Sequence, residues 1–177
     1  MNLTTLFLSI VLLVVPCIAQ NTDQHLVQAA FQGDLNRVSS LLNNGANVEA
    51  RDIKNGFAAL HSAAHGGNVQ VIKKLLDSGA NIKARTLSLD TALHIAAFAG
   101  RAEAVTELLN HGARINEVNA DNSTPLLNAA FAGHLEAVKV LLANGANKFH
   151  RNKSGATAQD AAEYAGYSAV AEYISAN

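Results

Sequence analysis

Histidine is the residue type in this chain best suited to metal binding or proton transfer, and the chain contains seven of them. No spacing of histidines and cysteines fits a zinc site, and the single cysteine is Cys17. The sequence also lacks the glycine-rich phosphate loops and the serine elbow of known enzyme classes. We therefore expect no catalytic residue, no metal and no cofactor. A metal-dependent site around His65 and nearby polar residues is the alternative.

Aromatic side chains form the second group with binding chemistry, because they make up only 5 % of the chain yet recur at one position. The residue that directly follows one particular pair in each copy carries a ring; the pairs are Ala29-Ala30, Ala63-Ala64, Ala96-Ala97, Ala129-Ala130 and, in the last copy, Ala162-Glu163. The residues that carry the rings are Phe31, His65, Phe98, Phe131 and Tyr164. Two interpretations stay open. The rings cover neighbouring helices, or they form a stripe that binds a partner, because aromatic side chains often anchor protein interfaces.

The aromatic positions belong to a sequence motif that recurs about every 33 residues. In the fourth copy, Thr124 and Pro125 have the types that begin a helix, and Gly133 has the type that ends one at positive φ. Four apolar residues then share one face of a second helix: Leu135, Val138, Leu141 and Leu142. Each copy therefore predicts a helix, a tight reversal, a second helix and a loop. The second copy has Ala58 in place of Thr124, so we expect no side-chain cap there.

The recurring motif resembles the ankyrin repeat, whose signature T-P-L-H-x-A recurs at a period of 33 residues. The resemblance covers residues 23–177, in repeats at about 23–51, 52–85, 86–118, 119–151 and 152–177. It implies an all-α solenoid of stacked helix–turn–helix units with hairpin-like loops. It also implies a structural role for His61 and His94, which occupy the histidine of the signature.

Members of the ankyrin family commonly contact partners through the end of the first helix, on the concave side, and through the loop tips. The resemblance therefore implies a non-catalytic protein-binding module. On this sequence the first set is the aromatic positions given above. The loop set is Arg51, Phe57, Arg85, Asp90, Asp121, Ser123 and Arg151. For each loop residue the alternative is a solvated surface side chain.

The charge balance bears on the kind of partner. The chain has 13 Lys and Arg against 14 Asp and Glu, for a formal charge of −1. This near-neutral, mixed composition does not favour nucleic acid or an anionic membrane. We expect a monomer that binds a protein partner.

The first 19 residues lie outside the repeat and resemble a secretory signal peptide. An apolar run at residues 6–15 is followed by Pro16 and by small residues placed for cleavage after Ala19. We expect a secreted or periplasmic protein that begins at Gln20 and does not contact the membrane. An uncleaved anchor over residues 3–19, which would make the chain a membrane-tethered scaffold, is one alternative. Lipidation of Cys17 is another, although Pro16 stands where such a motif has a small residue.

Overall fold

The computed structural model describes residues 22–52 and 54–177, so the predicted signal peptide lies outside the described residues. In this part of the chain the regular elements are helices, accompanied by one isolated antiparallel bridge between Arg51 and Ala58. Residues 22–32 are helical. The helices that follow are α2 (Leu35–Asn43), α3 (Ala59–Gly66), α4 (Val69–Asp77), α5 (Ala92–Phe98), α6 (Ala102–Asn110), α7 (Pro125–Phe131), α8 (Leu135–Ala143), α9 (Ala158–Tyr164) and α10 (Ser168–Ala176). The all-α prediction is confirmed.

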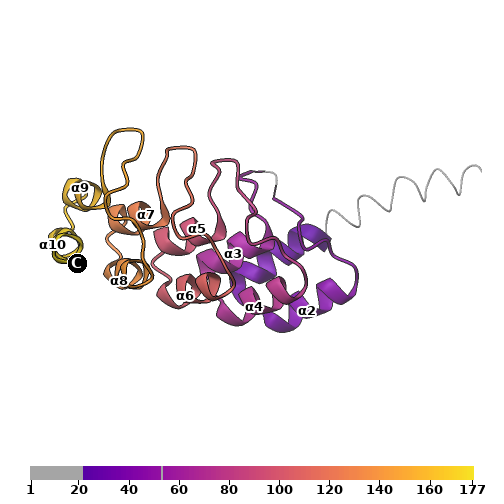
Figure 1. The fold of residues 1–177 in the computed structure, drawn as a ribbon. Coiled ribbons are helices and arrows are strands. Elements are labelled where there is room, and N and C mark those ends of the chain that lie inside the picture. The colour runs from indigo at the N-terminus through magenta and orange to yellow at the C-terminus, as the bar shows by residue number, and fades with distance from the viewer. Residues whose placement is uncertain (1–21, 53) are drawn as a thin grey trace, which may run out of the picture.

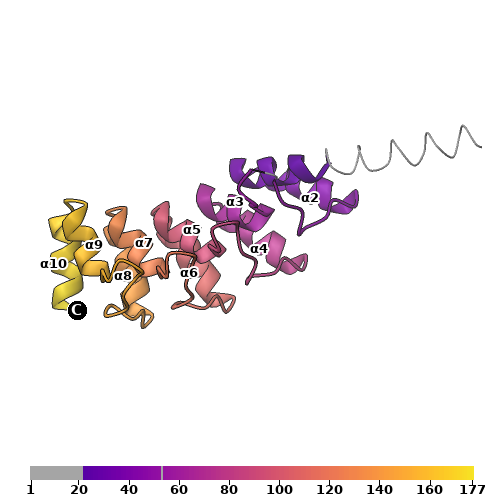
Figure 2. The ribbon, with the colours of Figure 1, turned by 90° about the horizontal axis from the view of Figure 1, so that it is seen from above.

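The helices stack in two rows (Figures 1 and 2). Helices α3, α5, α7 and α9 pack side by side in the inner row, and α2, α4, α6, α8 and α10 form the outer row. Long loops before the inner helices project from one side of the stack, as Figure 1 shows. Each inner helix also packs on the outer helix that follows it, so contacts run from each repeat to its neighbours. None of the described helices has the length and apolarity needed to cross a membrane.

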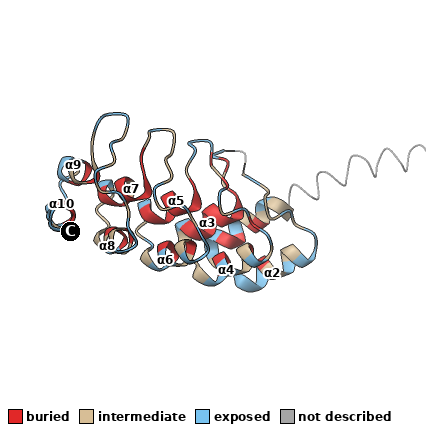
Figure 3. Cartoon of the chain, in the orientation of Figure 1, coloured by how far each residue is buried: buried red, intermediate tan, exposed pale blue. Residues whose placement is uncertain are grey.

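The Ala-Ala pairs lie at the centre of the stack, where buried residues line the faces between helices (Figure 3). Ala63, Ala64, Ala96 and Ala97 are each fully buried. Small side chains let successive inner helices approach closely, because little volume separates their backbones. The outer helices bury one apolar stripe each, as α8 does with Val138 and other residues of the same face.

The inner helices begin in two different ways. Thr124 accepts a hydrogen bond at Oγ1 from the N–H of Leu127, with Pro125 at the first helical position. At the start of α3, Ala58 has no side-chain acceptor, as its methyl group dictates. Instead, His61 Nδ1 accepts from the N–H of Ala58 at 3.1 Å.

The buried His61 ring joins two repeats. Because Nδ1 accepts, Nε2 carries the proton and donates to the carbonyl of Ala84 at 3.1 Å. Burial lowers the pKa of His61 to about 4, since a charged ring would lose its hydration. His94 makes the same kind of bond to the carbonyl of Ser123 at 3.0 Å, and burial also lowers its pKa. Both rings therefore fasten the start of an inner helix to the following loop.

The reversal between the two helices of a repeat is tied to the neighbouring repeat. Gly133 has φ of 77°, as expected, and the ring of Tyr167 from the next repeat packs over it. At the equivalent place in an earlier repeat, the Asn68 amide donates to the carbonyls of Ala30 and Phe31 at 2.9 and 2.8 Å. The ends of the inner helices are thus held by side chains from the repeat that follows.

Successive loops are joined by single backbone hydrogen bonds. Their residues are 51–57, 85–90, 118–123 and 151–156. The N–H groups of Leu87, Ala120 and Lys153 each donate to a carbonyl of the preceding loop, at 3.1, 2.9 and 2.9 Å. We call these bonds the loop rungs. They hold the four loops side by side at the spacing of the helices.

Candidate partner-binding groove

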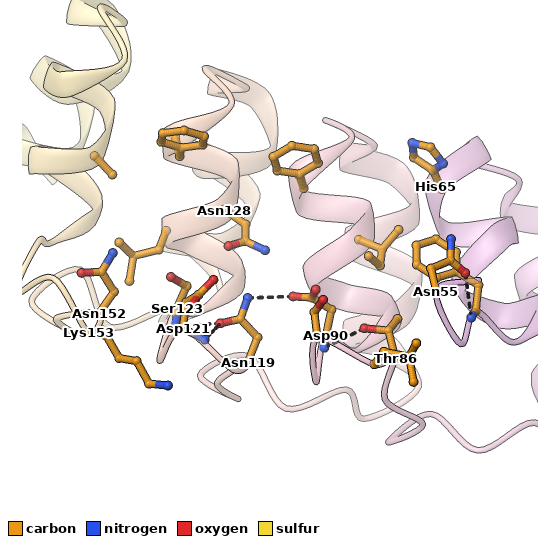
Figure 4. Close-up of a pocket in the computed structure, with 18 of the residues that line it drawn as sticks. Asn55, His65, Thr86, Asp90, Asn119, Asp121, Ser123, Asn128, Asn152 and Lys153 are labelled. Carbon is orange, nitrogen blue, oxygen red and sulfur yellow. Dashed lines mark hydrogen bonds between the residues drawn. The ribbon is translucent and has the colours of Figure 1, made fainter. Parts of the chain in front are cut away.

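A groove of about 960 Å³ runs along the stack where the four loops meet the inner helices (Figure 4). It extends from Lys54 in the second repeat to Ala161 in the fifth. Its floor comes from inner-helix residues one turn apart, because these side chains point away from the buried Ala-Ala face. The groove is lined by residues of both predicted sets and by residues that were not predicted.

Three of the five predicted ring positions line the groove, namely His65, Phe98 and Phe131. Phe98 is 51 % exposed and Phe131 is 49 % exposed, so each ring covers its helix with one part and leaves the rest to solvent. Phe31 and Tyr164 do not line the groove. The Phe31 ring lies 5.4 Å from the His65 ring, and Tyr164 is exposed on the last repeat.

Four of the predicted loop residues also line the groove: Phe57, Asp90, Asp121 and Ser123. Asp90 Oδ1 accepts a hydrogen bond from the Asn119 amide at 2.8 Å, whereas Asp121 is exposed on the next loop. Ser123 is buried, and its N–H donates to Asn119 Oδ1 at 3.0 Å. The structure thus brings carboxylates from two loops to the same groove as the half-exposed rings.

A family model described as ankyrin repeats (3 copies) matches residues 26–119 and 93–177. The chain belongs to the ankyrin-repeat family. The family and the all-α solenoid predicted from the sequence are therefore both confirmed. Ankyrin repeats generally serve as protein–protein interaction modules. No curated protein matches the chain significantly.

The predicted arginines of the ankyrin loops have intramolecular partners and do not line the groove. The Arg51 guanidinium donates to the carbonyls of Gly56 and Arg85. Arg85 donates to the carbonyl of Val118 and pairs with Glu117. These two side chains brace their own loop and the next one.

Arg151 has a more local role in the last ankyrin loop. Its guanidinium donates to the carbonyl of Gly155 at 2.6 Å and lies 3.8 Å from Asp160 Oδ2. A repeat pattern shows side-chain types but not where backbone carbonyls lie, so the sequence could not predict these hydrogen bonds of the loop arginines.

The sequence prediction missed three of the amides of the ankyrin groove, those of Asn119, Asn128 and Asn152. Four asparagines line it: Asn55, Asn119, Asn128 and Asn152. Asn119 Oδ1 accepts from Asp121 and Ser123, and Asn152 Oδ1 accepts from Ser154 and Ala156. Asn119 and Asn152 stand near the start of their loops, where short polar side chains favour turns. The sequence could therefore have indicated these two residues. The apolar lining includes Leu87, which is 72 % exposed.

The groove presents several types of side chain to solvent. It combines half-exposed aromatic rings, side-chain amides and two carboxylates. Among the described residues, no group of three or more His, Cys, Asp or Glu side chains is placed to hold a metal ion.

Proposed function

We propose that the chain is an exported, monomeric, non-catalytic module that binds a protein partner through the groove and its loop tips. The observation that carries the proposal is the pair of half-exposed rings, Phe98 and Phe131, on the floor of a groove lined by four repeats. Desolvation of such rings is a common source of binding energy in protein interfaces. The formal charge of −1 supports a protein rather than a nucleic acid as partner.

Replacing Phe98 and Phe131 together with alanine is expected to weaken partner binding by at least about thirtyfold, or about 2 kcal/mol. Stability falls by only about 1 kcal/mol per ring, because half of each ring is exposed already. The measurement is a pull-down from the exported fraction with the wild-type chain and the double variant. The captured protein is then identified and titrated against both.

The matched control is Phe149→Ala, which removes a ring that is 75 % exposed and lies outside the groove. This variant is expected to capture the partner as the wild type does. If the double variant captures the partner equally well, the groove is not the binding site. If it unfolds, the two rings belong to the core and the proposal fails.

For export, the expected result is a protein from the native host that begins at Gln20. N-terminal sequencing of the exported fraction measures this, because cleavage after Ala19 removes the apolar segment. A chain that keeps residues 3–19 and sediments with membranes would instead support the tethered scaffold.

A further inference from the structure

Asn128 presents an amide without a partner on the floor of the groove (Figure 4). It lies on α7, one turn before Phe131, and is half-buried. The equivalent residues of the neighbouring repeats are Ile95 and Ala161, so its surroundings along the stack are apolar. Its side chain makes no hydrogen bond to any described residue, whereas Asn119 and Asn152 are bonded within their loops.

This unpaired amide limits what can cover the groove. An amide in contact with water loses nothing, but the same amide buried without a partner costs about 1–3 kcal/mol. A molecule that fills the groove must therefore offer both an acceptor and a donor to Asn128. In an extended polypeptide, the N–H and C=O of one residue point to the same side, as in a hydrogen-bonded pair of strands. One side-chain amide matches that pair with its own acceptor and donor.

The charges of the groove add a second constraint. Asp90 and Asp121 lie on the two middle loops, and neither carboxylate forms an ion pair with a described residue. The lining lysines, Lys54 and Lys153, belong to the first and last of the four loops. The cation nearest in sequence, Arg85, is paired with Glu117. Charge complementarity therefore favours a positive side chain opposite the middle of the groove.

We infer that the groove binds an extended polypeptide segment with a lysine or arginine at its centre. The basic side chain lies between Asp90 and Asp121, and the backbone of a neighbouring residue bonds to the amide of Asn128. Apolar side chains of the segment pack on Phe98 and Phe131, whose faces also attract the cation. This inference rests on the proposed function, because it names the partner chemistry of the same groove.

The test uses a phage-displayed library of random peptides selected on the full chain. Enriched sequences are expected to contain a basic residue flanked by apolar residues. Synthetic versions are titrated by fluorescence anisotropy against three variants: Asn128→Leu, Asp90→Asn/Asp121→Asn and Phe98→Ala/Phe131→Ala. Each is expected to weaken binding by about tenfold or more. The carboxylate variant is also expected to flatten the dependence of affinity on salt.

N-methylation of single peptide residues isolates the backbone contact. At one position, methylation is expected to weaken binding to the wild type about tenfold but to have no further effect on Asn128→Leu. Matched controls are Asp77→Asn and Asn43→Leu, which change exposed residues of the outer helices. Both are expected to bind like the wild type.

The results separate this inference from the function on which it rests. Failure of any peptide to enrich, or enrichment of acidic peptides, overturns the inference. It is also overturned if a soluble oligosaccharide binds the groove and peptides do not. Peptide binding that depends on Phe98 and Phe131 but not on Asn128 or the two carboxylates refutes the inference and leaves the proposed function standing.

Discussion

Acidification is expected to destabilise the fold by up to about 3 kcal/mol through His61 alone. Folding lowers the pKa of His61 from 6.5 to about 4, and each unit of difference corresponds to about 1.4 kcal/mol. Below pH 6.5 the His61 ring becomes protonated in the unfolded chain, whereas in the folded chain it stays neutral until the pH nears 4. Stability is therefore full above pH 6.5 and is lost as the pH falls toward 4. The lowered pKa of His94 adds a loss of the same sign.

Urea unfolding of the wild type and of His61→Leu across this pH range measures the effect. The variant copies the fourth repeat, which has Leu127 at the equivalent position. At neutral pH it is expected to lose about 2 kcal/mol or more, since the groups that bond to the ring are left unpaired. Its stability is then expected to fall less steeply with acid than that of the wild type. Equal slopes for the two proteins would show that His61 is not the group responsible.

Replacing Gly133 with alanine is expected to cost about 2–5 kcal/mol. Part of the cost, about 1–2 kcal/mol, comes from a Cβ on a residue whose φ is 77°. The rest comes from contact, because that Cβ would lie 2.5 Å from the Tyr167 ring, and overpacking costs about 1–3 kcal/mol. Thermal or urea unfolding of the variant measures the total.

Gly145 offers a matched control. Its φ is 85°, but an added Cβ there has no neighbour within 4 Å. Gly145→Ala is therefore expected to show the conformational cost alone. In a Tyr167→Ala background, the cost of Gly133→Ala is expected to fall to the value for Gly145→Ala. If it does not, the ring of Tyr167 is not what the new methyl group meets.

The sequence predicted the architecture well because each repeat carries residue types that particular backbone conformations require. Gly133 was expected at positive φ and Thr124 at a helix start, and both are found. The loop at 51–57 is one residue longer than the other three loops, and hydrogen bonds within it accommodate the added length. Asp52 Oδ1 accepts from the N–H groups of Lys54 and Asn55 at 2.7 and 3.0 Å.

The site was harder to predict, because its composition depends on contacts between repeats. The arginine pattern alone could not show that Arg51 and Arg85 are bonded to loop carbonyls. Asn128 was not predicted because no single residue type recurs at its position, which holds Gln28, Ser62, Ile95 and Ala161 in the other copies. Tyr164 matches the aromatic pattern, but it does not line the groove, to which its helix α9 contributes Ala161. Periodicity identifies the positions that repeat, whereas the binding surface depends on those that differ.

The loop rungs give the groove a fixed unit of length. They keep successive loops in step with helices packed about 10 Å apart. An extended chain advances about 3.3 Å per residue, so one repeat spans about three residues of a bound segment. Equivalent positions on neighbouring repeats, such as Phe98 and Phe131, would then lie opposite residues of that segment that are about three apart. Because side chains of an extended chain alternate between its two faces, residues about six apart, across two repeats, would face the groove in the same way. In the proposed complex, each repeat added by duplication would therefore lengthen the bound segment by about three residues.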